Sequence, residues 1–462
     1  MKQVLSQDEV RFHPASYQDE AGRLFHWEGG LYRGISAASA PFLAGLVESA
    51  AFQKLVADKR LIETEIAPFA IEGFPLVLRH RRLPFVSYPF EWSGPMMKAA
   101  SLAVIDLARA LARADLMLKD AHLWNVLFDG SRPVWVDITS IVPLEGRKEW
   151  PAAAEFHDEC VYPLILLAQG RPSLARWLLA QDNGMPHDEL ETLGLARSVS
   201  ADVATLARRH LSERHRRILR RTLQPLRHLR SQKPTPPATF SLPQQLEALK
   251  AEIENISLPA TGTRAAHPPA TPEQSSDAKQ RSLQKILDQT KPRTVLDLAS
   301  GSGWYSELAA NFAAHVVAFD SDATAAAQLF RNAEARQLSI LPLVMDFTRP
   351  SPSRGLASHS HIAATERFPC EMVLLLGFLH DLVFRYRRLG LNEICDGLAA
   401  FSQRWVVVEF IPGDDPEVAA LQSDWFAGYT LENLKTALSR YFPKIEIFPS
   451  QPDSRVLLLG EK

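Results

Sequence analysis

The sequence predicts an α/β protein in which an α+β domain precedes a domain built on a parallel sheet. Three observations support this prediction. From residue 277 to the end, short apolar strands alternate with amphipathic helices, which is the pattern of a parallel sheet. In the first half, strands flank an amphipathic helix at 41–58, and a long helix follows at 96–114. Between these halves, residues 233–276 are rich in Pro and poor in apolar side chains.

These shifts in composition divide the chain. We expect one domain at 1–232, a linker at 233–276 that carries one short helix at 244–256, and a second domain at 277–462. With 462 residues, of which 46% are hydrophobic and 23% are charged, the chain is long enough for two or three globular domains.

Composition also excludes several functional classes. The net charge of −2 gives no overall attraction to nucleic acid or to an anionic membrane. The three cysteines lie far apart, which argues against a disulfide framework or a Cys-rich metal site and suits a reducing compartment. Apolar runs such as 161–168 are too short to cross a bilayer, and the N-terminus lacks a signal-like apolar segment. We therefore expect a cytoplasmic protein without a membrane span.

The stretch VLDLASGSGWYSELAA at 295–310 predicts a strand, a tight turn and a helix. Glycines at 301 and 303 allow the backbone to approach a ligand, and the following helix N-terminus favours anionic groups. The next strand, HVVAFD, ends at Asp320, which lies 17 residues after Gly303. A carboxylate at that strand end is placed to accept hydrogen bonds from the ribose hydroxyls of a nucleoside.

This stretch resembles motif I of the class I S-adenosylmethionine-dependent methyltransferases, in which an acid precedes a glycine-rich turn. Here Ala299 replaces the first glycine. Two alternatives remain: a nicotinamide dinucleotide fingerprint, whose third glycine would fall on Ser306, and a structural turn with no ligand. The resemblance implies a Rossmann-like domain that binds S-adenosyl-L-methionine through Asp297, Ala299, Ser300, Gly301, Gly303, Asp320, Asp346 and Phe347.

Further features of the second domain follow from the same resemblance. Asp346, beyond the third strand at 340–344, would bond the adenine amino group, and Phe347 would flank the ring. His380, beyond the fourth strand, would lie near the methyl group and either position the acceptor or remove its proton; alternatively, it only starts a helix. The chain ends in a predicted hairpin, and this antiparallel finish is typical of the methyltransferases and not of dehydrogenases.

The segment LKDAHLWNVLFDGSRPVWVDITS at 118–140 carries a second constellation. Its layout resembles the catalytic loop and metal-binding aspartate of protein-kinase-like folds, most closely the aminoglycoside phosphotransferase branch. The resemblance implies Asp120 as the base and Asn125 and Asp137 as Mg²⁺ ligands for Mg-ATP. No strand lysine for the nucleotide phosphates is visible, so we expect weak nucleotide binding at most. Alternatively, the three side chains only organise the loop.

The two halves together resemble a group of bacterial nodulation-type class I methyltransferases, over about residues 25–460. This resemblance implies methyl transfer to a small molecule or glycan, with a regulatory or acceptor-binding kinase-like domain. The alternatives are a bifunctional kinase-methyltransferase and a catalytically silent scaffold that binds S-adenosylmethionine. The Arg-rich segment at 208–233 is either a solvated helix face or a patch for an anionic substrate, and it lacks the aromatic residues that single-stranded nucleic acid binders use for stacking.

Overall fold

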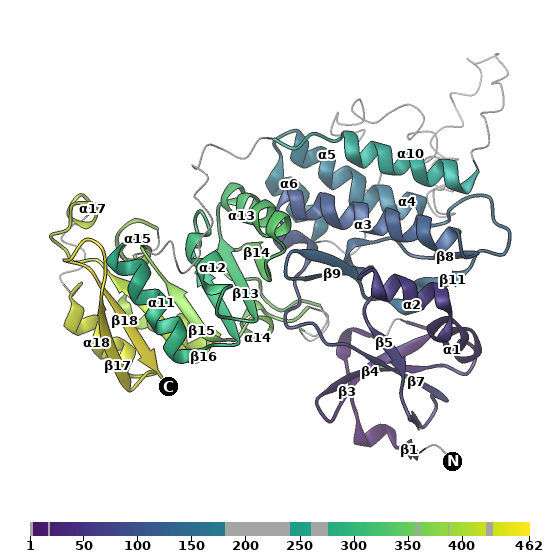
Figure 1. Cartoon of the computed structure of the whole chain (residues 1–462), viewed down its shortest axis with the longest axis horizontal. Helices are drawn as coiled ribbons and strands as arrows, with labels where there is room; N and C mark the ends of the chain where they lie inside the picture. Colours follow the sequence, from purple (N-terminus) through teal and green to yellow (C-terminus); the bar gives the residue numbers. More distant parts are fainter. Residues whose placement is uncertain are drawn as a thin grey trace, which may run out of the picture.

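A computed structural model describes most of the chain; the Arg-rich segment at 208–233 and more than half of the predicted linker lie outside the described part. The described residues are 3–16, 19–180, 241–259, 276–355, 358, 361–386, 388–421 and 428–462. Figure 1 shows the C-terminal sheet and its helices on the left, and the N-terminal elements on the right.

The N-terminal part begins with a mixed α and β layer. Among the described residues its main sheet has five antiparallel strands in the order β2-β3-β4-β7-β5. Glu28 and Gly29, both with positive φ, form the turn that joins two of these strands. The bounds of the strands are β2 Arg11–Phe12, β3 Gly22–Trp27, β4 Gly30–Ile35, β5 Thr64–Ile66 and β7 Leu76–His80. A smaller parallel pair joins β1 Gln3–Leu5 to β6 Phe69–Ile71.

The prediction of a single helix at 41–58 is wrong, because the structure has two helices in this range. Helix α1 Ala40–Glu48 ends at Ser49, whose ψ of 144° is extended, and α2 Ala50–Ala57 begins there. The Ser49 hydroxyl accepts a hydrogen bond from the amide of Phe52 at 3.2 Å. Serine at this position caps a free backbone amide and so favours the start of a new helix, although the apolar periodicity of the sequence continues through it.

A helical layer follows, built around the long helix α3 Gly94–Ala112. The short helix predicted at 244–256 is present as α10 Leu242–Asn255; it lies along α3 (Figure 1) and buries Leu246, Leu249 and Ile253. The same layer contains α4 Ala153–Phe156, α5 Tyr162–Ala168 and α6 Pro172–Leu179. Two small antiparallel pairs join β9 Val126–Asp129 to β10 Arg132–Trp135, and β8 Leu116–Leu118 to β11 Ile141–Pro143.

In the described C-terminal region, seven strands form one sheet in the order β14-β13-β12-β15-β16-β18-β17. All neighbours are parallel except the pairs that involve β18, so the predicted antiparallel finish is confirmed. Most residues of the parallel strands are apolar and buried on both faces, as is typical of parallel sheets, whereas the antiparallel edge strand β17 is mostly exposed. The strands are β12 Thr294–Leu298, β13 His315–Asp320, β14 Ile340–Val344, β15 Cys370–Leu375, β16 Ser402–Phe410, β17 Lys444–Pro449 and β18 Val456–Glu461.

Helices cover both faces of this sheet. Apolar side chains of α11 Ala278–Thr290, α12 Trp304–Ala309 and α13 Ala323–Arg336 share one cluster on the first face. Those of α16 Leu391–Phe401 and α18 Leu431–Ser439 belong to the cluster on the second face. Ligands of such open sheets bind beyond the carboxyl ends of the parallel strands, which directs attention to the loops after β12, β13 and β15.

The two halves of the chain are packed together. One hydrophobic cluster runs without interruption from α3 and β9 into the C-terminal sheet. Phe128 of β9 meets Phe330 of α13 edge-on, with ring centroids 5.9 Å apart. At the β9-β10 turn a side chain on Gly130 would come within 2.9 Å of the Ser339 Cα, so only glycine permits this approach.

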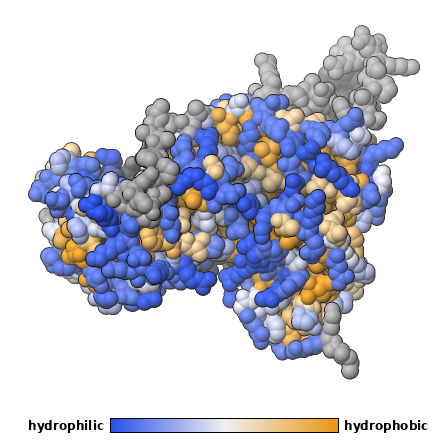
Figure 2. Space-filling model, viewed as in Figure 1, coloured by the Kyte–Doolittle hydropathy of each residue, from blue (hydrophilic) through white to orange (hydrophobic). Residues whose placement is uncertain are grey.

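The face of the molecule seen in Figure 2 is mostly hydrophilic, with scattered apolar residues. Within the described ranges, every helix is too short or too polar to cross a bilayer.

Candidate functional site

The glycine-rich turn after β12 has a backbone that favours glycine at several positions. Ala299, Gly301 and Gly303 have φ values of 56°, 58° and 86°. A side chain on Gly303 would come within 2.4 Å of the Leu329 side chain, so this glycine lets α13 pack against the turn. The Ser300 amide donates to the Phe319 carbonyl at 3.1 Å, which ties the turn to the neighbouring strand.

The structure brings Asp320 to the same turn. One carboxylate oxygen of Asp320 accepts a hydrogen bond from the Gly301 amide at 2.8 Å, and the other accepts from the Asp322 amide, also at 2.8 Å. The residue is 9% exposed at the carboxyl end of β13. Two backbone amides therefore orient this carboxylate beside the turn, where the sequence placed it.

Asp297, at the end of β12, is almost completely buried, with 2% of its surface exposed. Its carboxylate accepts a hydrogen bond from the Ser306 hydroxyl at 2.5 Å. The pKa of Asp297 is raised to about 7: burial is the largest cause and nearby Asp320 adds to it, while the Ser306 hydrogen bond and the Lys279 charge oppose the shift. The group therefore titrates near neutral pH, and a bound cation would favour its ionised form.

Asp346 and Phe347 follow β14 and differ in their surroundings. An Asp346 oxygen accepts hydrogen bonds from the Thr348 amide and hydroxyl at 2.9 and 2.7 Å. The Phe347 ring is buried against Phe401 of α16, with ring centroids 6.2 Å apart. The expected roles of these two residues toward an adenine ring stay predictions.

His380 lies in the short helix α15 Leu379–Asp381 beyond the carboxyl end of β15. The residue is 5% exposed, and its Nδ1 has no hydrogen-bond partner in the described part of the chain. Burial lowers the pKa of His380 below its usual value, although the Asp381 carboxylate, 3.9 Å from Nε2, opposes this effect. The imidazole is therefore mainly neutral at pH 7 and able to accept a proton.

In the N-terminal part, Asp137 is held in a network of charged and hydroxyl groups. An oxygen of Asp137 accepts from the Thr139 hydroxyl at 2.6 Å, and Nη1 of Arg33 lies 3.2 Å from the same oxygen. Arg33 also pairs with Asp19 and donates to the Thr139 hydroxyl at 2.8 Å. Arg33 lies on β4 and was missed by the sequence analysis, which searched the strands for lysine alone.

The other two residues of this constellation are more exposed or differently paired. The Asp120 side chain is 38% exposed, with the Lys119 ammonium 3.9 Å away. Burial raises the pKa of Asp120, Lys119 lowers it, and Asp137 and Asp19 raise it, so these carboxylates lie near one another. The Asn125 amide nitrogen is 3.3 Å from Nε2 of His122. Among the described residues no group of three or more His, Cys, Asp or Glu side chains is arranged to hold a metal ion.

A cavity of about 280 Å³ lies next to this network. It is bounded by β3, β4, β7 and β9, and residues Ile362, Glu366 and Arg367 of the C-terminal half also reach it. Burial lowers the pKa of His80 in its wall to about 3, so this imidazole is neutral, and its Nε2 has no hydrogen-bond partner among the described groups. The wall is completed by apolar side chains: Leu24, Leu31, Ile62, Leu83, Leu127 and Val136.

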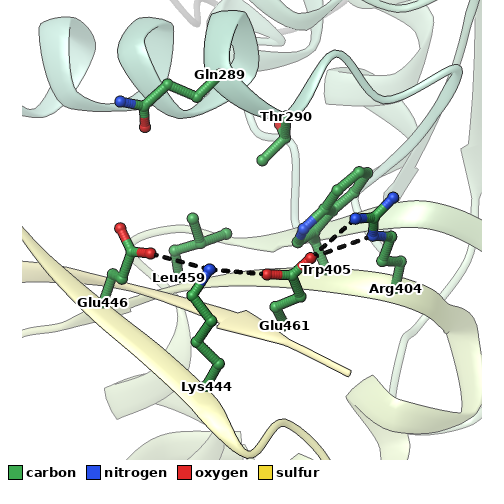
Figure 3. A pocket seen from close by; sticks show the side chains of 8 residues that line it. All are labelled: Gln289, Thr290, Arg404, Trp405, Lys444, Glu446, Leu459 and Glu461. Carbon is green, nitrogen blue, oxygen red and sulfur yellow. Dashed lines mark hydrogen bonds and ion pairs between the residues drawn. The ribbon is translucent and has the colours of Figure 1, made fainter.

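A second cavity, of about 200 Å³, is lined by residues from the end of α11 and from β16, β17 and β18 (Figure 3). Its charged side chains pair with one another: Lys444 bonds Glu446 and Glu461, and Glu461 also bonds Arg404. Because these charges are already compensated at the amino-terminal edge of the parallel strands, we assign this cavity no ligand.

No protein-family model matches the chain. Nodulation protein NoeA of Rhizobium meliloti (strain 1021) is 27% identical over 453 residues, which cover 92% of this chain and 90% of NoeA.

Three solved structures are similar to 40% of the chain. They are N-methyltransferase NodS from Bradyrhizobium japonicum WM9 (13% identity, 96% of that chain, TM-score 0.29), magnesium protoporphyrin IX methyltransferase ChlM from Synechocystis PCC 6803 with bound SAH (13%, 84%, 0.27), and monomeric WbdD (17%, 42%, 0.30). The similarity to NoeA thus extends over most of the chain, whereas the similarity to these solved structures covers 40% of it.

Proposed function

We propose that the protein is an S-adenosylmethionine-dependent methyltransferase that binds its cofactor over the turn between β12 and α12. The observation that carries this proposal is the hydrogen bond from the Gly301 amide to Asp320, which joins the glycine-rich turn to the carboxylate expected to hold the ribose. The antiparallel β18 in an otherwise parallel sheet supports the same conclusion.

The dinucleotide alternative is less well supported. Its fingerprint needs a third glycine for close packing of helix on strand, and the chain has Ser306 at that position. Ser306 is fully buried and uses its hydroxyl to bond Asp297. The position therefore has a polar role of its own that glycine could not fulfil.

The proposed reaction is in-line transfer of a methyl group from the sulfonium of S-adenosylmethionine to an acceptor. Positioning of the two reactants supplies much of the rate in such a transfer. A base is needed only if the acceptor is a hydroxyl or a protonated amine, and His380, neutral and beyond the end of β15, would then take the proton. Asp346 and Phe347 keep their proposed roles at the adenine.

For the N-terminal half we propose a kinase-like domain with a regulatory or acceptor-binding role. The five-stranded sheet, the adjacent cavity and Asp137 support a nucleotide-sized site. The ion pair between Arg33 and Asp137 argues against a bound Mg²⁺ ion, because the Arg33 guanidinium already neutralises the carboxylate that would bind the metal. Metal-dependent ATP turnover by the purified chain would favour the bifunctional kinase-methyltransferase instead. We also propose that the kinase-like domain spans residues 1–232 and the methyltransferase domain residues 277–462.

The acceptor is proposed to be a small molecule or a glycan, which is the class that the resemblance to nodulation-type methyltransferases implies. We place the reaction in the cytoplasm, which agrees with three buried cysteines that carry free thiols. Mass spectrometry of small molecules and glycans from cells with and without the gene tests the proposal, since the product should differ from its precursor by one methylene unit. Failure to consume S-adenosylmethionine with every extract would leave a silent scaffold as the better account.

A further inference from the structure

A buried ion pair lies at the carboxyl edge of the C-terminal sheet, and the proposed chemistry does not yet use it. Nζ of Lys279, on α11, is 2.6 Å from a carboxylate oxygen of Glu409, near the end of β16. The two side chains are 13% and 0% exposed. The second oxygen of Glu409 accepts a hydrogen bond from the Ser450 hydroxyl at 2.7 Å. Removing two charges from water is costly, so a pair placed here calls for an explanation beyond stability.

The pair faces the proposed cofactor site. A side chain on Gly377, just beyond β15, would come within 3.7 Å of the Glu409 carboxylate and 3.9 Å of Nζ of Lys279. Nζ of Lys279 also lies 4.6 Å from the ring centroid of Tyr305, on the helix that follows the glycine-rich turn. Lys279 therefore lies close both to Tyr305, on the helix after the β12 turn, and to Gly377, in the loop that leaves β15.

An ammonium group has three N–H donors, and the bond to Glu409 uses one of them. Glu409 and Ser450 hold the ammonium in a fixed direction, while the aromatic face of Tyr305 supports the charge from another side. A fixed cation with donors to spare is suited to bind a carboxylate.

We propose that Lys279 binds the α-carboxylate of the amino-acid end of S-adenosylmethionine, and that Glu409 is a positioning residue for its ammonium group. This inference rests on the proposed methyltransferase function and deepens it. It assigns the adenosine end of the cofactor to the turn and Asp320, and the amino-acid end to a charge supplied by α11.

Two ligands separate this role from a structural one. S-Adenosylhomocysteine carries the amino-acid end, whereas 5′-methylthioadenosine has the same adenosine and sulfur without it. The full-length chain would be titrated with each ligand by calorimetry, as wild type, Lys279→Met and Glu409→Gln. Lys285→Met is a matched control, since Lys285 lies on the same helix but is exposed.

Lys279→Met should bind S-adenosylhomocysteine about ten- to a hundred-fold more weakly than the wild type, because it loses a hydrogen bond between charged groups. Binding of 5′-methylthioadenosine should stay unchanged, and Lys285→Met should resemble the wild type with both ligands. Glu409→Gln should show a smaller loss, again confined to S-adenosylhomocysteine. Equal loss of both ligands, or no loss of either, would overturn the inference.

Lys279→Met leaves Glu409 buried without its cation, so that variant could unfold. The double variant Lys279→Met/Glu409→Gln removes both charges and should fold, yet retain the selective loss of S-adenosylhomocysteine. A double variant that binds S-adenosylhomocysteine as tightly as the wild type contradicts the inference. If the wild type binds neither ligand, the proposed function itself fails, and the inference falls with it.

Discussion

Arg367 and Glu91, which are 276 residues apart in sequence, form an ion pair inside the contact between the two halves of the chain. Their side chains are 2% and 1% exposed, and one guanidinium nitrogen lies 2.9 Å from a Glu91 oxygen. The guanidinium also donates to the Val86 carbonyl at 2.7 Å and lies 4.0 Å from the ring centroid of Tyr88. The SYPFEW segment at 87–92 is therefore a docking element for the helix that precedes β15.

Replacing one member of this pair should destabilise the whole chain. Arg367→Met would leave the Glu91 carboxylate buried and uncompensated, which costs about 3–5 kcal/mol. Denaturant unfolding of the full chain measures the loss, and Arg367→Met/Glu91→Gln should recover a large part of it. If the single variant is as stable as the wild type, the contact between the halves is not maintained in solution.

Asp320→Ala should lower both cofactor affinity and stability. The substitution removes an acceptor proposed for the ribose hydroxyls and also frees the Gly301 and Asp322 amides that the carboxylate now binds. Each lost hydrogen bond to a charged acceptor is worth about 1.5–3 kcal/mol, which is roughly ten- to a hundred-fold in the dissociation constant. Calorimetry with S-adenosylhomocysteine and thermal melting measure the two effects. A folded variant with unchanged affinity would remove Asp320 from the site.

The raised pKa of Asp297 makes the stability of the unliganded protein depend on pH. The pKa of an unfolded aspartate is about 3.9, whereas the folded value is about 7. The folded state therefore holds the proton more tightly, and this contribution to stability is present in acid and lost as pH rises through about 7. Asp297→Asn, which cannot ionise, should gain melting temperature relative to the wild type between about pH 5 and pH 8. A constant difference between the two proteins across this range would contradict the assigned pKa shift.

In the N-terminal half, Arg33 pairs with Asp137, the carboxylate that the resemblance to kinase-like folds assigns to Mg²⁺. Wild-type protein should show no thermal shift with Mg²⁺ alone, because the guanidinium already compensates Asp137 and Asp19. Arg33→Met should be less stable, and Mg²⁺ should restore part of the loss by binding the freed carboxylates. The variant Arg33→Met/Asp137→Asn should lose that response, while its affinity for S-adenosylhomocysteine stays intact. A clear Mg²⁺ shift in the wild type would argue for a functional metal site.

Most of the parallel strands of the C-terminal sheet could be predicted because they are short, mostly apolar runs bounded by polar or turn-forming residues. The strands that end near Leu298 and Asp320 are examples. The same local signals identified the turn, since the positive φ values at Gly301 and Gly303 require residues that the sequence displays.

Features that depend on distant residues could not be predicted in this way. Lys279 and Glu409 are 130 residues apart, and no local pattern couples a helix start to a strand end in that manner. The pairing of Arg33 with Asp137 has a weak signal, a cation within the strand GLYRGI, which a search for lysine overlooks. The packing of α10 on α3 follows from the apolar face of a helix whose flanking segments suggested a linker.

The central claim is that the C-terminal site binds S-adenosylmethionine and not a dinucleotide. Calorimetric titration of the full-length chain with S-adenosylhomocysteine, and separately with NAD, tests it most directly. The account predicts saturable binding of S-adenosylhomocysteine, weakened in Asp320→Ala, and no heat of binding with NAD. Saturable binding of NAD, or the absence of S-adenosylhomocysteine binding by folded protein, would contradict it.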